Sequence, residues 1–178
     1  MNKNMTDKLA IILMGMPCSG KSTARQKLLE FYNPNNTLDF VVLSTDDYLD
    51  NKAKELSLSY NEVFKKEIKH ATKQLKTDLD DAIKEGKCIL WDQTNLTKKK
   101  RKYIMDSIPN DYDKIIVYLD TPWDILMQRN KYRTQVENKT IPFAAMKAMW
   151  DSIELVTEDE EFDILQTIPW KEDERQTF

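Results

Sequence analysis

The chain has 178 residues, enough for one domain of ordinary size, and this excludes architectures that need about 250 residues, such as a (β/α)₈ barrel. Of these residues, 40% are hydrophobic and 32% are charged, a composition that supports a globular core and excludes a membrane protein. The 27 Lys and Arg and 30 Asp and Glu residues give a net charge of −3, so a site for a polyanion has to be local.

Cysteine content and the first apolar segment bear on the compartment. Cys18 and Cys88 are too few to cross-link a domain of this size, and neither has a partner at metal-ligand spacing. The apolar run at residues 9–14 is too short for a signal peptide or a membrane span. We therefore expect a cytoplasmic protein with no membrane attachment, and the sequence leaves its oligomeric state open.

Short apolar runs alternate with longer segments of helical period, which is typical of an α/β fold with a parallel sheet. The expected strands are residues 9–14, 40–43, 88–91 and 114–119, with a shorter fifth at 164–168. The expected helices are residues 21–31, 60–84, 98–107, 123–130 and 142–156. The pattern predicts one domain, residues 1–178, with four or five parallel strands and helices on both faces of the sheet.

A phosphate-binding motif lies between the first strand and the first helix. Residues 15–22 read GMPCSGKS, which satisfies G-x-x-x-x-G-K-[ST] and uses two of the three glycines in the chain. Such a loop points backbone N–H groups at phosphate oxygens, and we expect Lys21 to bridge the β- and γ-phosphates of a nucleotide and the Ser22 hydroxyl to bind Mg²⁺. The alternative is a tight turn with a chance lysine. The residues expected to contact the nucleotide here are Gly15, Pro17, Cys18, Ser19, Gly20, Lys21, Ser22 and Thr23.

Polar residues follow the second and third strands, at the sheet edge where ligands bind in open parallel sheets. Asp46 is the candidate general base that accepts the proton of an attacking hydroxyl, and helix capping is the alternative. Asp47 and Tyr48 are candidate acceptor contacts, the tyrosine by stacking on a base. Asp92 occupies a Walker-B-like place and joins Ser22 as a candidate Mg²⁺ ligand.

Two further groups of residues are candidates, each with a plainer alternative. Thr94 and Asn95 would contact the acceptor or cap the next helix. Within the basic run at 98–102, Lys98, Lys99 and Arg101 would contact an acceptor phosphate backbone or form a solvated helix face.

Two arginines precede a polar stretch at 134–140, and we expect a small lid at about residues 129–141. The two arginines are Arg129 and Arg133, and Arg133 would neutralise charge on the transferring phosphate. The alternative for Arg133 is compensation of a helix dipole.

These residues resemble the kinase domain of the phage polynucleotide 5′-kinases, within the adenylate-kinase-like P-loop kinases, over about residues 9–150. The residues that carry the resemblance are the motif at 15–22, Asp46-Asp47-Tyr48, Thr94-Asn95-Leu96, Asp120-Thr121-Pro122-Trp123 with Arg129-Asn130, Ile141-Pro142 and Met149. The resemblance implies transfer of the γ-phosphate of ATP to a 5′-hydroxyl end, with Asp46 as general base, Arg133 on the transferring phosphate and Arg129 in a lid.

Two departures from the family pattern concern the acceptor. Leu49 stands where the family places an arginine that grips the acceptor's 3′-phosphate, and no phosphatase domain follows within the 178 residues. We expect an ATP- and Mg²⁺-dependent kinase whose favoured acceptor is a 5′-hydroxyl end of DNA or RNA. Two alternatives stay open: a P-loop kinase for another hydroxyl (a nucleoside, a metabolite, an aminoacyl-tRNA or a hydroxymethylated base in DNA), and a nucleotide-binding module without transfer activity.

Overall fold

A computed structural model of the chain describes residues 7–137 and 139–171. Its centre is a five-stranded parallel sheet in the order β2-β3-β1-β4-β5. The strands are β1 (Leu9–Met14), β2 (Phe40–Leu43), β3 (Cys88–Trp91), β4 (Asp113–Asp120) and β5 (Ile164–Pro169). The chain leaves β1 towards β2 and β3 and later crosses to β4 and β5, so the strand order reverses at β1. A crevice at the carboxyl ends of the strands next to such a reversal is the usual place for a ligand.

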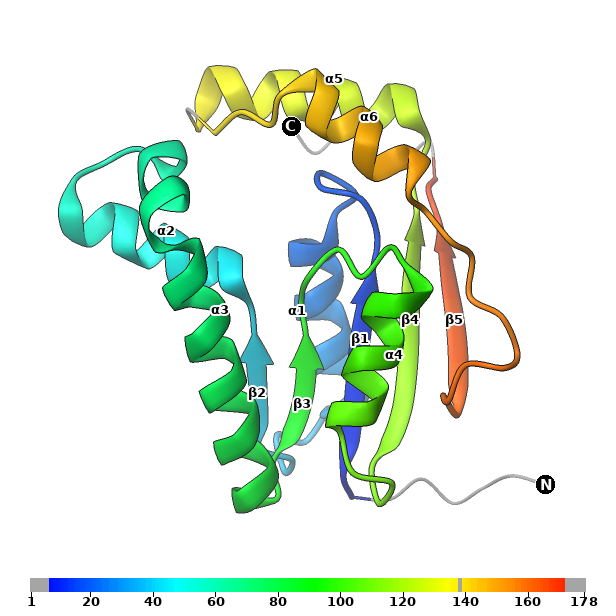
Figure 1. Ribbon diagram of the computed structural model, residues 1–178. Helices are drawn as coiled ribbons and strands as arrows, with labels where there is room; N and C mark the ends of the chain where they lie inside the picture. Colours follow the sequence, from blue (N-terminus) through cyan, green and yellow to red (C-terminus); the bar gives the residue numbers. More distant parts are fainter. Residues whose placement is uncertain (1–6, 138, 172–178) are drawn as a thin grey trace.

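Six helices surround the sheet within the described residues. They are α1 (Lys21–Tyr32), α2 (Thr45–Leu56), α3 (Tyr60–Glu85), α4 (Lys98–Ser107), α5 (Trp123–Val136) and α6 (Phe143–Asp151). Figure 1 shows α1 on one face of the sheet, α3 and α4 on the other, and α5 and α6 across the carboxyl ends of the strands. Among the described residues, none of these helices is long and apolar enough to cross a membrane.

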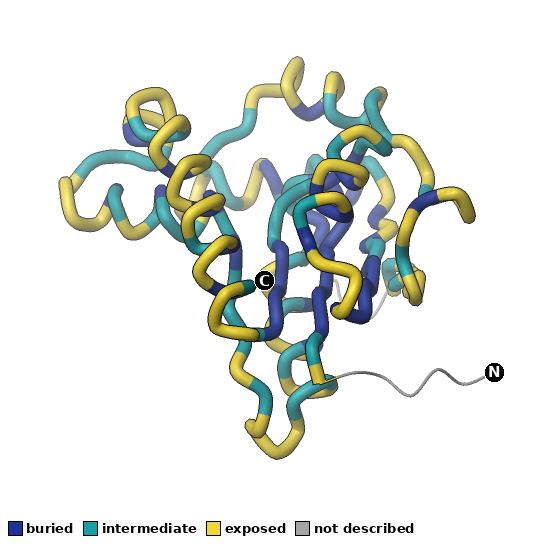
Figure 2. Tube along the Cα trace, turned by 60° about the horizontal axis from the view of Figure 1, so that its bottom comes forward, coloured by how far each residue is buried: buried dark blue, intermediate teal, exposed yellow. Residues whose placement is uncertain are grey.

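Both faces of the central strand are buried, as its continuous apolar sequence requires. Side chains of a strand alternate between the two faces, so Ala10 and Ile12 pack towards α3 and α4, whereas Ile11 and Leu13 pack towards α1. The tube in Figure 2 shows this buried centre in dark blue, with exposed outer faces on the helices. The five expected strands are confirmed to within one residue at each end.

Two helices differ in length from the sequence prediction. Helix α5 continues to Val136 instead of ending near residue 130, because no helix breaker intervenes and Arg133 pairs with Glu137 across its last turn. Residues 129–136 of the expected lid at 129–141 are therefore helix. Helix α6 ends at Asp151 instead of residue 156, because the N–H of Glu154 bonds to the carbonyl of Leu96 and draws the chain away in an extended path.

Helix α2 is absent from the sequence prediction, although it carries the aspartates that follow β2. Ser44 caps it by accepting a hydrogen bond from the N–H of Asp47, which fixes where the helix begins. Its apolar residues Leu49 and Ala53 are buried against Val63 of α3. The pair α2 and α3 forms one wall beside the carboxyl end of the sheet (Figure 1).

Candidate phosphotransfer site

A cleft of about 2120 Å³ opens at the carboxyl ends of the strands. The loop after β1, the first turns of α1, α2 and α3, the end of β3 and the α5–α6 segment all contribute to its lining. A pocket for one small ligand usually measures about 300–1,000 Å³. The cleft is therefore large enough for two ligands side by side.

The loop after β1 depends on its two glycines. A Cβ at position 15 would lie 2.8 Å from Ser19 Oγ and 3.3 Å from Leu119, so a side chain there would displace the loop. Gly20 has φ 97° and stands at the start of α1, where no side chain caps the helix. The first N–H groups of α1 therefore lack a side-chain cap and face the cleft, as in an anion-binding helix terminus.

Lys21 turns back over this loop. Its Nζ donates hydrogen bonds to the carbonyl oxygens of Gly15 (3.0 Å) and Met16 (2.8 Å). Burial lowers the pKa of Lys21, and the negative charges of Asp92 and Asp46 act in the opposite direction. An ammonium group that loses water in this way binds a phosphate oxygen strongly.

Ser19 gives a second sign of an anion site. Its side chain is buried, and its Oγ has no hydrogen-bond partner among the described residues. Buried hydroxyl groups are normally paired, so this one calls for a ligand atom or a water. Thr121, which follows β4, fixes the loop from the other side by donating to the carbonyl of Ser19 (3.2 Å).

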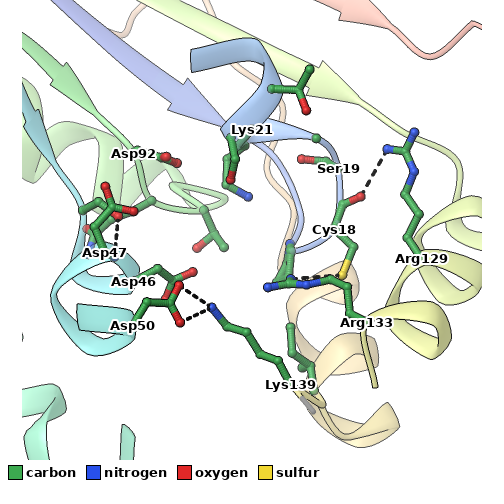
Figure 3. Close-up of a pocket in the computed structure, with 18 of the residues that line it drawn as sticks. Cys18, Ser19, Lys21, Asp46, Asp47, Asp50, Asp92, Arg129, Arg133 and Lys139 are labelled. Atoms are coloured by element: carbon green, nitrogen blue, oxygen red, sulfur yellow. Dashed lines mark hydrogen bonds and ion pairs between the residues drawn. The ribbon is translucent and has the colours of Figure 1, made fainter. Parts of the chain in front are cut away.

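Asp46 faces the cleft from the first turn of α2 (Figure 3). It is exposed, and its Oδ1 accepts a hydrogen bond from the Tyr60 hydroxyl at 2.5 Å. Because Ser44 supplies the cap of α2, the capping alternative for Asp46 and Asp47 is wrong. The Asp46 carboxylate is thus available for proton transfer.

Asp92 and Asp47 are joined by an arginine that the sequence analysis missed. Arg25 Nη1 lies 2.6 Å from Asp47 Oδ2 and 3.4 Å from Asp92 Oδ2. Burial raises the pKa of Asp92, while Lys21 and Arg25 lower it. Arg25 stands one helical turn after Lys21 on α1, and this spacing is the signal that could have found it.

Two predicted acceptor contacts after β2 and β3 do not reach the cleft, whereas Thr94 does. Asn95 is 1% exposed, has φ 49° and donates from Nδ2 to the carbonyl of Leu13, so its role is in the core. Tyr48 is half-buried and packs with the α2–α3 cluster. The prediction that Asn95 contacts the acceptor is therefore wrong, whereas the stacking role of the half-buried Tyr48 stays a prediction.

The basic run meets the cleft at a residue that the sequence analysis passed over. Lys100 lines the cleft, and burial lowers its pKa. Lys98 is instead paired with Asp159, and Lys99 is exposed outside the cleft lining. Arg101 is 0% exposed, so the prediction that it binds an acceptor is wrong.

Helix α5 brings two arginines over the phosphate-binding loop, as Figure 3 shows. Arg129 donates to the carbonyl of Cys18 (3.3 Å), and Arg133 lies 3.5 Å from the Cys18 sulfur. Lys139, in the segment between α5 and α6, reaches across to α2 and contacts both carboxylate oxygens of Asp50 at 3.0 Å. Neither Lys139 nor Asp50 was predicted as a site residue.

A magnesium ion fits this donor set. The Ser22 hydroxyl and the Asp92 carboxylate are hard oxygen ligands on the cleft wall. Within residues 7–137 and 139–171, no group of three or more His, Cys, Asp and Glu side chains is arranged to hold a metal ion by itself. Mg²⁺ is usually bound by one or two protein ligands together with nucleotide phosphates, and the site matches that mode.

The sheet order and the loop after the central strand define a P-loop protein with a kinase-like fold. The profile of the family described as "AAA domain" (AAA_33) matches residues 11–156, and the chain belongs to this family. A probable 6-phosphofructo-2-kinase of Schizosaccharomyces pombe is 33% identical over 136 residues, which are 70% of this chain and 23% of that protein. The chain thus spans less than a quarter of this relative's length.

Solved structures agree in fold. A candidate kinase of Chloroflexus aurantiacus superposes with a TM-score of 0.69 at 17% identity and covers 97% of this chain and 90% of its own. Kti12 of Chaetomium thermophilum, solved with ADP-AlF3, gives a TM-score of 0.61 at 18% identity over 93% of this chain and 91% of its own. At these identities the likeness concerns the fold alone.

Proposed function

We propose that the protein is an ATP-dependent phosphotransferase that moves the γ-phosphate to a hydroxyl of a second ligand. The observation that carries this proposal is the position of Asp46. This aspartate does not cap its helix, and it faces the cleft close enough to Lys21 to act on it electrostatically. A protein that only binds nucleotide needs no such group. The kinase relative of Schizosaccharomyces pombe supports the same reaction class.

The phosphates of ATP would bind at the N-terminus of α1. The backbone N–H groups, the Ser19 hydroxyl and the Lys21 ammonium would surround them. Ser22 and Asp92 would hold Mg²⁺, which when bound draws charge from the phosphate oxygens. A phosphate oxygen would replace one of the two loop carbonyls that now accept from Lys21.

Asp46 would remove the proton of the acceptor hydroxyl as the new O–P bond forms. The bond between the γ-phosphorus and ADP breaks in the same reaction, and the acceptor proton passes to the carboxylate. Arg133, which lies against Cys18 of the loop, would neutralise the charge on the transferring group. Arg129 would hold the loop and the nucleotide from the same helix.

For the acceptor we propose, in the first place, a 5′-hydroxyl end of DNA or RNA. The size of the cleft and the cation Lys100 beside it support this acceptor. A smaller alcohol is the second candidate, because Asp46, Asp47 and Asp50 line the acceptor side of the cleft and disfavour a polyanion.

Labelled ATP tests the function and separates the two acceptors. The protein would be incubated with 5′-hydroxyl oligonucleotides, nucleosides and sugars, and the label would be followed into each product. Transfer to oligonucleotides with a KM that rises with salt, and rises further in Lys100→Met, supports the nucleic acid acceptor. Transfer to a small alcohol at a salt-independent KM supports the second candidate, and ATP binding without transfer to any of them, or to water, contradicts the proposed reaction.

A further inference from the structure

The Tyr60 hydroxyl holds one oxygen of the Asp46 carboxylate. Tyr60 is the first residue of α3, and its OH donates to Asp46 Oδ1 at 2.5 Å. Burial, together with the charges of Asp46 and Asp50, raises the pKa of Tyr60 well above its usual range. The phenol therefore stays protonated at neutral pH and is a permanent donor to Asp46.

Tyr60 is itself held by Lys139. The Lys139 ammonium lies 3.8 Å from the centroid of the Tyr60 ring and 3.0 Å from both carboxylate oxygens of Asp50. The Lys139 side chain is 12% exposed, so this is a largely desolvated cation on an aromatic face, a favourable arrangement. Asp50 stands one turn after Asp46 on α2, and Figure 3 shows Lys139 reaching towards the two aspartates.

These contacts join three elements next to Asp46. Lys139 comes from the α5–α6 segment, Asp50 from α2 and Tyr60 from α3. Asn130 anchors the same segment to α5 through two hydrogen bonds with the backbone of Ile141, one as donor (2.8 Å) and one as acceptor (3.2 Å). Helix α5, which carries the two arginines over the loop, is therefore connected through Asn130 to the segment that carries Lys139.

We propose that Tyr60 is a positioning residue for the Asp46 base and that Lys139 clamps Tyr60 in that role. This inference rests on the proposed phosphotransferase function. With Oδ1 held by the phenol, the second oxygen of Asp46 takes the proton of the acceptor hydroxyl, while the O–P bond to the acceptor forms and the bond to ADP breaks. Tyr60 keeps its own proton throughout.

A competing interpretation is that the Tyr60 hydroxyl occupies the place of the acceptor hydroxyl and leaves when the acceptor binds. The packing of Tyr60 argues against this interpretation. Its ring lies 6.0 Å from that of Phe64, packs against the α2–α3 cluster and carries Lys139 on its face. A side chain fixed on several sides is a poor candidate for displacement.

The variant Tyr60→Phe removes only the hydroxyl, and Tyr103→Phe is its matched control because Tyr103 is exposed on α4 and outside the cleft lining. The assay is steady-state transfer from ATP to a 5′-hydroxyl DNA oligonucleotide, with hydrolysis by water measured in parallel. Loss of a hydrogen bond to a charged group predicts a fall in kcat of about 10-fold or more. The KM for ATP should stay unchanged, because Tyr60 does not contact the phosphate-binding loop.

A double-variant cycle separates positioning from a structural role. If Tyr60 acts through Asp46, adding Tyr60→Phe to Asp46→Asn should cause no further loss of kcat. Lys139→Met should lower kcat in the wild-type background and much less in the Tyr60→Phe background. Its control is Lys147→Met, which removes a lysine paired with Asp151 on the surface of α6.

The possible outcomes separate the positioning role of Tyr60 from the proposed phosphotransferase function. An active wild type with Tyr60→Phe and Lys139→Met equal to their controls overturns the positioning role and leaves the proposed function standing. A Tyr60→Phe protein with raised kcat or a lower acceptor KM overturns it in favour of the competing interpretation. Full additivity of Tyr60→Phe with Asp46→Asn also overturns the positioning role. A wild type that binds ATP but transfers phosphate to no oligonucleotide, nucleoside, sugar or water overturns the proposed function as well.

Discussion

The Lys21 ammonium lies 2.8 Å from the carbonyl oxygen of Met16, so the cation that we propose to bind phosphate contacts its own loop. Burial lowers its pKa, which means that the folded, ligand-free protein is less stable for carrying this charge. The unfolded chain holds the lysine proton more tightly than the folded chain does, because the pKa of Lys21 is lowered on folding. The destabilisation caused by the buried charge therefore decreases, and the free energy of unfolding increases, as the pH rises towards the usual pKa of lysine.

We expect Lys21→Met to melt at the same temperature as the ligand-free wild type or at a higher one. Addition of ATP and Mg²⁺ should raise the Tm of the wild type and leave that of Lys21→Met unchanged, because the variant lacks the phosphate contact. Thermal denaturation with and without nucleotide measures both effects. Lys102→Met, which removes an exposed lysine paired with Asp106, is the control. A nucleotide-dependent rise in the variant equal to that of the wild type would refute the P-loop assignment.

Arg101 and Glu160 form a buried ion pair that ties α4 to the segment before β5. Arg101 Nε and Nη2 lie 2.7 and 2.8 Å from the two Glu160 oxygens, and the side chains are 0% and 3% exposed. Although burial acts in the opposite direction, the hydrogen bonds from Arg101 hold the pKa of Glu160 below its usual range. Stability from this pair is therefore present at neutral pH and is lost as the pH falls below the usual range of glutamic acid.

Glu160→Gln should reduce the free energy of unfolding at pH 7 by about 3–5 kcal/mol, because it leaves the Arg101 charge buried without a counter-charge. Urea denaturation at several pH values measures the loss, and the gap between variant and wild type should narrow in acid. The neighbouring exposed pair of Lys98 and Asp159 supplies the control, since Asp159→Asn should change little. Equal effects of the two variants would contradict the structural role of the buried pair.

The sequence predicted the sheet well because every strand except the edge strand β5 contains a continuous apolar run, as short buried strands require. Helix α2 was missed because its sequence is mostly polar: of its 12 residues, only Leu49 and Ala53 are apolar and buried, which is too few to show a helical period. The end of α5 was placed too early because its last turns are polar. Where a helix lies over a cleft instead of a core, its sequence shows no apolar residues at helical spacing from which its end could be predicted.

The site was predicted where a motif or a strand end indicates it, as for Lys21, Asp46 and Asp92. Tyr60 and Lys139 were missed because their contacts join distant segments: Lys139 and Asp50 are 89 positions apart. Arg101 was misassigned because five consecutive cations look like a surface. Its helical spacing from the buried residues Ile104 and Met105 is the signal that places it inside.

The burial of Leu49 leads to a prediction about the acceptor. Leu49 is 0% exposed and packs against α3, so the position that would bear a phosphate-gripping arginine points away from the cleft. The cleft-facing neighbour is Asp50, whose charge is engaged by Lys139. We expect little difference in kcat/KM between a 5′-hydroxyl mononucleotide with a 3′-phosphate and one with a 3′-hydroxyl.

Steady-state kinetics with the two mononucleotides measures this ratio. A strong preference for the 3′-phosphate would contradict the prediction and would point to Lys54, which lines the cleft from the end of α2. Lys54→Met should then abolish the preference. Lys52→Met is the control, because Lys52 pairs with Glu55 outside the cleft lining.

The most direct test of the account is the turnover of Asp46→Asn at saturating ATP. Asparagine keeps the size of the side chain and can still pair with Tyr60, but it cannot take the acceptor proton. We predict an unchanged affinity for ATP, measured by calorimetry, and a kcat lower by about 10²–10⁴-fold, the usual range for a lost general base. Wild-type turnover in Asp46→Asn, or a loss explained entirely by weaker ATP binding, would contradict the assignment of Asp46 as the base and with it the proposed reaction.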